Sequence, residues 1–254
     1  MDFDDFDDIV ARLRAAGCVF AEDEARLLLD QASDGLPEMV RRRVAGEPLE
    51  YVLGWAEFAG RRFVVAPGVF VPRHRTELLV RLAAGFARTR SVVLDLCCGS
   101  GALGATVAAE VPGIELYAAD IEPAAVECAR RNVPGKVCEG DLYSPLPASL
   151  RGRVNVLISN VPYVPTDEVA LMPPEARDHE PRVALDGGPD GLDVLRRVVA
   201  EAPEWLAPGG HVLFEASERQ AEAAAAEVRR AGLAAAVEQS EELGATVVVG
   251  LREH

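Results

Sequence analysis

The chain has 254 residues and is 49% hydrophobic, which is enough to build one large α/β domain and a small additional domain. Its 26 Lys and Arg residues face 41 Asp and Glu residues, and the resulting net charge of −15 disfavours tight binding to nucleic acid. The five cysteines lack paired C-x-x-C spacing, which argues against disulfides and a metal site, and no apolar run approaches the roughly 18 residues that span a membrane, so we expect a cytoplasmic protein.

The first 45 residues carry apolar side chains at helical spacing, such as Phe6 and Ile9, interrupted by glycine and proline. We expect residues 1–45 to form a small helical domain that recognises the substrate. In residues 46–71 two short β-type runs flank a glycine turn, which predicts a β-hairpin that links this domain to the rest of the chain. Residues 72–254 then form the main domain.

Within the main domain, predicted strands and helices alternate along the chain. This alternation is typical of a doubly wound α/β fold with a parallel sheet. The last two apolar runs, 233–237 and 245–251, are only a few residues apart, so they predict an antiparallel hairpin at the sheet edge. The other expected strands are 91–96, 114–119, 136–138, 154–159 and 211–215, and the expected helices are 102–110, 123–131, 190–206 and 217–231.

A glycine-rich turn follows the first predicted strand of this sheet. Gly99, Gly101 and Gly104 fit the G-x-G-x-x-G fingerprint, and Asp120 ends the next apolar run at the distance expected of an acid that binds ribose hydroxyls. The pattern therefore indicates a cofactor with a ribose. By itself it does not identify the cofactor, and a tight strand-to-helix turn without a ligand is the structural alternative.

Asp95 lies inside the predicted strand, at a position where a nicotinamide-binding strand is normally apolar. A buried carboxylate requires a partner. S-adenosylmethionine supplies one, because its methionyl end carries an ammonium group that this acid can hold directly or through loop amides and water. The alternative is an Asp that only caps the following turn.

The run N-V-P-Y-V-P begins at Asn160, directly after the predicted strand 154–159. Ligands bind at the carboxyl ends of strands in open α/β sheets. The Asn160 amide oxygen and the Val161 carbonyl can accept both hydrogens of a substrate –NH2 group, which leaves the nitrogen lone pair directed at an activated methyl group. Tyr163 would cover the flat amide. A proline-stiffened loop with a buried Asn is the structural alternative.

These motifs, in this order, resemble the protein-(glutamine-N5) methyltransferases of HemK type, which modify the Gly-Gly-Gln tip of peptide release factors. The resemblance covers nearly the whole chain and includes the runs G-E-P-L-E-Y-V-L-G-W, V-P-R-H-R-T-E-L-L-V, D-L-C-C-G-S-G-A-L, I-S-N-V-P-Y-V-P and E-P-R-V-A-L-D-G-G-P-D-G-L-D. It implies a class I S-adenosylmethionine-dependent methyltransferase domain with a Rossmann-like seven-stranded sheet, preceded by a small N-terminal helical domain. It also implies a protein acceptor such as a peptide release factor.

The resemblance further implies roles for individual residues. The residues expected to bind the cofactor, from its methionine side through its ribose to its adenine, are Asp95, Cys97, Cys98, Gly99, Ser100, Gly101, Asp120, Asp141, Leu142 and Asn160. The residues expected to take the substrate amide are Asn160, Val161, Pro162 and Tyr163.

The chain departs from the family pattern at three places. The family's Asn-Pro-Pro-Tyr has Val161 at its second position, where valine keeps the backbone carbonyl but lacks the fixed φ of proline. Arg75 stands where the family's R-P-E-T-E or R-P-D-T-E has an acid. Near the C-terminus, where the family has D-x-x-G-x-x-R, this chain has no arginine in the corresponding segment. These departures bear on the identity of the acceptor.

We therefore interpret the chain as an S-adenosylmethionine-dependent N-methyltransferase that acts on a glutamine side-chain amide of a protein, such as a peptide release factor. Methylation of another amide or amine, in a small molecule or a nucleic-acid base, is the first alternative, and the net charge of −15 argues against a nucleic acid. A noncatalytic cofactor-binding module is the second, although such a module would not need Asp95, Asp120 and Asn160 together. Nicotinamide oxidoreduction has no use for the Asn160 loop.

Overall fold

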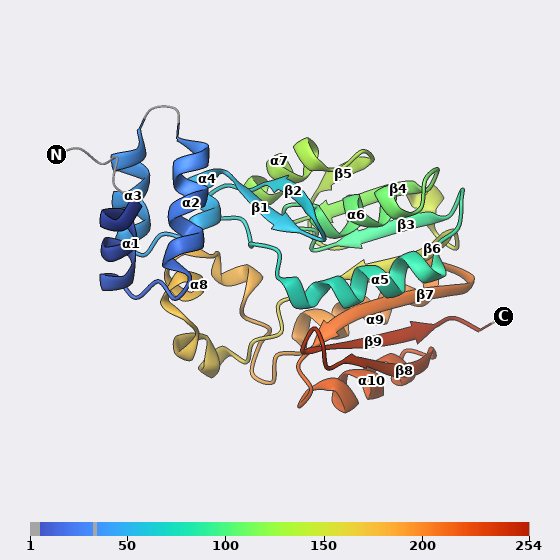
Figure 1. The fold of residues 1–254 in the computed structure, drawn as a ribbon. Coiled ribbons are helices and arrows are strands. Elements are labelled where there is room, and N and C mark those ends of the chain that lie inside the picture. Colours follow the sequence, from blue (N-terminus) through green and yellow to red (C-terminus); the bar gives the residue numbers. More distant parts are fainter. Residues whose placement is uncertain (1–5, 33–34, 254) are drawn as a thin grey trace.

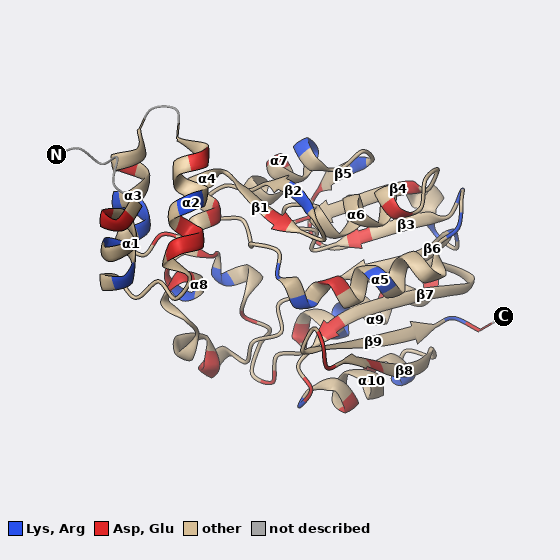
Figure 2. Cartoon of the chain, in the orientation of Figure 1, with Lys and Arg blue, Asp and Glu red and all other residues tan. Residues whose placement is uncertain are grey.

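A computed structural model describes residues 6–32 and 35–253 of the chain. The chain forms a group of short helices at its N-terminal end and a larger α/β part built on a seven-stranded sheet (Figure 1). Acidic and basic residues are mixed over both parts (Figure 2). No helix of the described residues is long and apolar enough to cross a membrane.

The N-terminal part packs its helices around an apolar core of its own. Ile9, Leu13 and Leu28 are fully buried there, because apolar residues recur on one face of each helix, and Val52 and Leu53 join the same core. The helices are α1 (Phe6–Ala15), α2 (Ala21–Gln31), α3 (Leu36–Val44) and α4 (Leu49–Leu53).

The segment predicted as a hairpin linker, residues 46–71, contains α4 as well as a hairpin. Because α4 packs in the N-terminal core, that core extends into the predicted linker. The hairpin follows as the antiparallel strands β1 (Trp55–Phe58) and β2 (Arg61–Val64). The Asn132 side chain bonds the N–H and the carbonyl of Val64 at 2.9 and 2.8 Å, so the hairpin is also fixed to the α/β part.

The strands of the large sheet are β3 (Val92–Leu96), β4 (Glu115–Asp120), β5 (Lys136–Glu139), β6 (Val154–Ser159), β7 (Leu206–Ala216), β8 (Ala234–Ser240) and β9 (Ala245–Leu251). Their order is β5-β4-β3-β6-β7-β9-β8. The strands from β5 to β7 in this order run parallel, whereas β9 is antiparallel to both β7 and β8. This confirms the predicted doubly wound sheet with an antiparallel hairpin at its edge.

The helices that cover the two faces of this sheet are α5 (Glu77–Phe86), α6 (Ala102–Glu110), α7 (Pro123–Asn132), α9 (Asp193–Trp205) and α10 (Ala221–Arg230). Successive side chains of a strand point to opposite faces. Accordingly Val93 packs in the core under α5, α6 and α7, whereas Leu94 and Leu96 pack in the core under α9 and α10. Asp95 alternates with Leu94 and therefore faces α6.

Most predicted boundaries agree with the structure within a few residues, and α6 and β6 have the predicted bounds. α9 and α10 begin later than predicted, because the residues before them form turns, and β7 begins earlier, at Leu206. The short elements of the connecting loops are η1 (His74–Thr76), η2 (Ala148–Leu150), η3 (Thr166–Leu171), α8 (Pro174–His179) and η4 (Arg182–Ala184).

Candidate active site

A cavity that is open to solvent at its mouth lies at the carboxyl ends of β3, β4 and β6. This is the edge at which open α/β sheets bind ligands. Nine of the residues predicted from the sequence lie in its wall: Cys97, Cys98, Gly99, Ser100, Asp120, Asp141, Leu142, Asn160 and Pro162. The predicted residues that lie outside the wall are Asp95, Gly101, Val161 and Tyr163.

Asp120 ends β4, and backbone N–H groups fix both of its carboxylate oxygens. Oδ2 accepts a hydrogen bond from Gly99 N at 2.8 Å, and Oδ1 accepts one from Glu122 N at 2.9 Å. Burial raises the pKa of Asp120, and these N–H groups oppose the rise. The carboxylate is therefore held rigidly at the cavity wall, and each oxygen keeps a lone pair for a further donor.

The loop between β3 and α6 places two thiols at the cavity wall. Burial raises the pKa of Cys97 to about 12 and raises the pKa of Cys98 well above its usual value. Both thiols stay protonated at neutral pH, so neither is a nucleophile. Gly101 lies behind the wall, where its N–H donates to Cys98 O at 2.7 Å just before α6 begins.

Asp95 is fully buried between β3 and α6 and does not reach the cavity. Its Oδ2 accepts a hydrogen bond from Gly104 N at 2.9 Å, and its Oδ1 has no partner among the described residues. Burial raises the pKa of Asp95 to about 7, with a smaller contribution from the charge of Asp120, against the opposing effect of the Gly104 N–H. Asp95 therefore supports the loop from behind instead of lining the pocket.

We expect Asp95→Asn to change how stability depends on pH. The pKa of an Asp is about 3.9 in an unfolded chain, and the folded value is about 7. The folded protein thus binds this proton more tightly, and the stabilisation present below about pH 4 is lost as the pH rises through 7. Asn cannot ionise but keeps an acceptor for Gly104 N.

Urea unfolding of both cofactor-free proteins between pH 4 and pH 8 tests this expectation. Relative to the variant, the wild-type protein should lose roughly 1.4 kcal/mol of unfolding free energy per pH unit between about pH 4 and pH 7, and no more above that. Parallel pH profiles of the two proteins would contradict the raised pKa of Asp95.

Asn160 follows β6, lines the cavity and has an amide oxygen without a hydrogen-bond partner among the described residues. The end of the strand is fixed by Ser159, whose Oγ donates to Leu96 O at 2.8 Å. The Oδ1 atom of Asn160 is buried, and no described residue donates a hydrogen bond to it. A buried acceptor without a donor costs about 1–3 kcal/mol. An N–H group of a ligand would remove this cost.

The next residues of this loop point in different directions. Pro162 lies in the cavity wall, whereas the Val161 side chain is only 1% exposed and packs in the core under α9. Tyr163 lines a second pocket. Its hydroxyl donates to Glu215 Oε1 at 2.7 Å and accepts from Arg75 Nη2 at 2.6 Å. Tyr163 was expected to cover the substrate amide, and the structure places it in the lining of the second pocket and not in the wall of the first.

A glycine-rich segment, residues 185–193, clamps the Asn160 loop. Gly187 N donates to Val164 O at 2.8 Å. Gly191 approaches the loop so closely that a Cβ there would be 2.2 Å from Tyr163 O. In the sequence this segment is recognisable as part of a family motif, and its repeated glycines are the signal for a close approach of two backbones.

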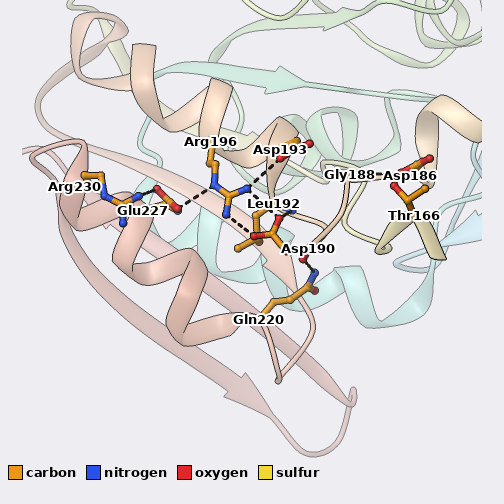
Figure 3. Close-up of polar contacts among 10 residues, drawn as sticks. All are labelled: Thr166, Asp186, Gly188, Asp190, Leu192, Asp193, Arg196, Gln220, Glu227 and Arg230. Atoms are coloured by element: carbon orange, nitrogen blue, oxygen red, sulfur yellow. Dashed lines mark hydrogen bonds and ion pairs between the residues drawn. The ribbon is translucent and has the colours of Figure 1, made fainter. Parts of the chain in front are cut away.

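Polar contacts fasten this clamp to α9 and α10 (Figure 3). Gln220 Nε2 donates to Asp190 O at 2.9 Å. It also donates to Tyr163 O at 2.9 Å. Arg196 of α9 donates to Asp190 Oδ1 at 2.9 Å and to Glu227 Oε1 of α10 at 3.0 Å. The backbone after Asn160 is therefore tied to two helices of the main domain.

The cavity wall also contains residues that the sequence did not single out. Arg197 of α9 bonds Asp141 at 2.6 Å, and no local pattern predicts a pair 56 positions apart. Ile121 is 50% exposed. Its position directly after Asp120 is the sequence feature that indicates a place in the cavity wall. Phe70 and Val183 add further apolar surface to the wall.

Known proteins resemble this chain in sequence and in fold. The family model described as Methyltransferase small domain matches residues 60–172. A release factor glutamine methyltransferase of Geobacter sulfurreducens is 39% identical over 219 residues, which cover 84% of this chain and 76% of that protein. A 4-amino-L-phenylalanine/4-methylamino-L-phenylalanine methyltransferase of Streptomyces pristinaespiralis is 39% identical over 186 residues, which cover 69% of this chain and 63% of that protein.

A solved structure shows the same fold at low sequence identity. A methyltransferase from Pyrococcus furiosus has a TM-score of 0.57 and 17% identity, and the match covers 76% of this chain and 90% of that chain. This likeness concerns the fold, whereas the sequence relatives show the family. The chain belongs to the release factor glutamine methyltransferase family and is an S-adenosyl-L-methionine-dependent methyltransferase.

Proposed function

We propose that this chain methylates the side-chain amide nitrogen of a glutamine in a protein, such as a peptide release factor. The observation that carries the proposal is the buried Oδ1 atom of Asn160, which has no donor among the described residues and belongs to a residue that lines the cavity. An amide –NH2 group has two N–H donors, and Asn160 Oδ1 would accept one of them. We assign the second to the backbone carbonyl of Val161, whose side chain packs in the core outside the cavity wall. Family membership supports the same acceptor, since the Geobacter relative is named for it.

The cavity residues fit the cofactor, whose sulfonium supplies an electrophilic methyl group. We assign the methionine side to the loop 97–101 and the ribose hydroxyls to Asp120, because both carboxylate oxygens are already fixed by backbone N–H groups. Asp141 and Leu142 would lie by the adenine. The ion pair of Asp141 with Arg197 at 2.6 Å closes this side of the wall.

The protein's own groups bind and orient the acceptor nitrogen. When Asn160 Oδ1 and the Val161 carbonyl accept both of its hydrogens, the nitrogen lone pair is directed away from the loop. The lone pair of an amide is delocalised, so positioning and hydrogen bonding must lower the barrier. As the N–C bond forms and the methyl–sulfur bond of the bound cofactor would break, the nitrogen gains positive charge, which both oxygen acceptors would stabilise. The nitrogen then releases one proton to water, since the cavity is open to solvent.

Asp120→Ala should weaken the binding of S-adenosylmethionine by about tenfold or more. A hydrogen bond to a charged group contributes roughly 1.5–3 kcal/mol, and Gly99 N also loses its partner. Isothermal titration calorimetry measures the affinity. Glu139→Ala is the matched control, because Glu139 ends the neighbouring strand β5 outside the cavity wall. Equal affinities of both variants would remove Asp120 from the cofactor site.

A small-molecule amine is the second candidate acceptor. The Streptomyces pristinaespiralis relative, named for 4-amino-L-phenylalanine, is also 39% identical to this chain. The same two acceptors on the Asn160 loop would hold an aromatic –NH2 group, and Val161 departs from the family's proline at this loop.

An acceptor assay separates these candidates. Purified protein and labelled S-adenosylmethionine are incubated with a Gly-Gly-Gln peptide, a matched Gly-Gly-Glu peptide or 4-amino-L-phenylalanine. We expect label in the Gly-Gly-Gln peptide alone, because only that peptide presents an amide –NH2 group on the side chain after the two glycines. Transfer to 4-amino-L-phenylalanine alone would replace the proposed acceptor by the second candidate.

We place this reaction in the cytoplasm. All five cysteines are free, which fits a reducing compartment. The net charge of −15 also fits a protein acceptor better than a nucleic acid.

A further inference from the structure

A second pocket lies at the carboxyl end of β7, beside the turn between β8 and β9. Tyr163 lines it, whereas Asn160, three positions earlier in the same loop, lines the cofactor cavity. Three residues span at most about 11 Å. The two pockets are therefore lined by residues of one loop that lie within about 11 Å of each other along the chain.

Glu215 is the buried acid of this second pocket. Its side chain is 3% exposed. Its Oε1 accepts hydrogen bonds from Arg75 Nε at 2.9 Å and from the Tyr163 hydroxyl at 2.7 Å. Its Oε2 is buried and has no donor among the described residues. Glu215, which lines the pocket, thus keeps an acceptor for a ligand N–H group.

The charge of the pocket favours a cationic ligand. The carboxylates of Glu215, Glu218 and Glu241 line it together with the guanidinium of Arg75, so two negative charges are in excess. Arg75 already bonds Glu215 through Nε and Tyr163 through Nη2. A cation would meet both the excess negative charge and the free Oε2 atom, and charge-assisted hydrogen bonds of this kind are the strong ones.

We propose that the second pocket binds the cationic side chain, Arg or Lys, of an acceptor residue near the methylated glutamine. The proposal rests on the glutamine acceptor proposed above and makes Glu215 a specificity-determining residue. Arg75, which stands where the family has an acid, holds Glu215 and Tyr163 together and so connects this pocket to the Asn160 loop.

The first test uses a small cation and does not depend on methyl transfer. n-Butylguanidinium and its neutral counterpart n-butylurea are titrated into isotope-labelled protein. We expect only the cation to shift the backbone amide signals of Ser217 and Thr246, which line the pocket. Glu215→Gln should weaken the binding of n-butylguanidinium about tenfold. Glu241→Gln should weaken the binding of the same cation roughly two- to fivefold. Glu242→Gln, the next position but outside the wall, is the matched control and should leave binding unchanged.

The second test links the pocket to the acceptor. The peptides carry Arg either before or after the Gly-Gly-Gln sequence, and matched peptides carry neutral citrulline at the same position. Calorimetry on protein saturated with S-adenosylhomocysteine compares their affinities. With Arg on the favourable side, we expect about tenfold tighter binding. This preference should disappear in Glu215→Gln and persist in Glu242→Gln.

The outcomes of both tests separate this inference from the proposed function. Equal affinities of the Arg and citrulline peptides, or equal signal shifts with n-butylguanidinium and n-butylurea, would overturn the cation pocket and leave the glutamine acceptor in place. If no peptide binds while n-butylguanidinium still binds and depends on Glu215, the cation pocket stands and the glutamine acceptor falls.

Discussion

Asn160→Ala should lower kcat for methyl transfer by about 100-fold or more without lowering the melting temperature. The Oδ1 atom of Asn160 has no hydrogen-bond donor among the described residues, so the substitution removes no side-chain bond to this oxygen from the free protein. In the transition state this oxygen would hold an –NH2 group that gains positive charge. Loss of one positioned partner of this kind costs roughly 3 kcal/mol. Single-turnover kinetics at saturating cofactor, with thermal unfolding, measures both effects.

Asn155 is the matched control for this experiment, because it lies in β6, the strand that Asn160 directly follows. Its Oδ1 accepts a hydrogen bond from Val92 N at 2.8 Å, a contact within the sheet. Asn155→Ala should therefore lower the free energy of unfolding by about 1 kcal/mol and leave kcat of the folded protein unchanged. If Asn160→Ala keeps full turnover on its acceptor, or if Asn155→Ala loses rate equally, the proposed hydrogen bond from the substrate –NH2 group to Asn160 is wrong.

The sheet is predictable from the sequence because its buried parallel strands are apolar runs that end at turns. β6 has its predicted bounds for this reason, and α6 also has its predicted bounds. α4 is different, since the run L-E-Y-V-L is too short for its period to distinguish a strand from one helical turn. Its packing against the N-terminal core, which involves residues far away in the sequence, decides in favour of the helix.

The candidate site is predictable only as far as the ends of the strands. Asp120 ends β4 and Asn160 follows β6, and the parallel order of the sheet brings both into one cavity. The direction of Tyr163 depends on Glu215, which lies 52 positions away, and no local pattern encodes that contact. Likewise the sequence does not reveal that the Val161 side chain faces the core instead of the cavity.

Gly191→Ala should lower kcat/KM by roughly 100-fold, although Gly191 lies outside the cavity wall. A Cβ at this position would be 2.2 Å from Tyr163 O and 2.3 Å from Gln220 Nε2, distances that force these atoms apart. The loop after Asn160 would then shift, and Tyr163 O would lose the hydrogen bond from Gln220. A shift of about 1 Å in a group that positions reacting atoms lowers the rate by roughly 100-fold.

Gly152 is the matched control, because its alanine variant has the same backbone strain without the steric clash. Its φ of +71° is close to the +76° of Gly191, but nothing lies within 4 Å of the added Cβ. Both alanine variants should lose about 1–2 kcal/mol of unfolding free energy from the left-handed backbone, whereas only Gly191→Ala should also lose rate. Urea unfolding and steady-state kinetics measure the two losses separately. If both variants keep the wild-type kcat/KM, the segment 185–193 contributes to folding alone, and the Asn160 loop holds its geometry without the clamp.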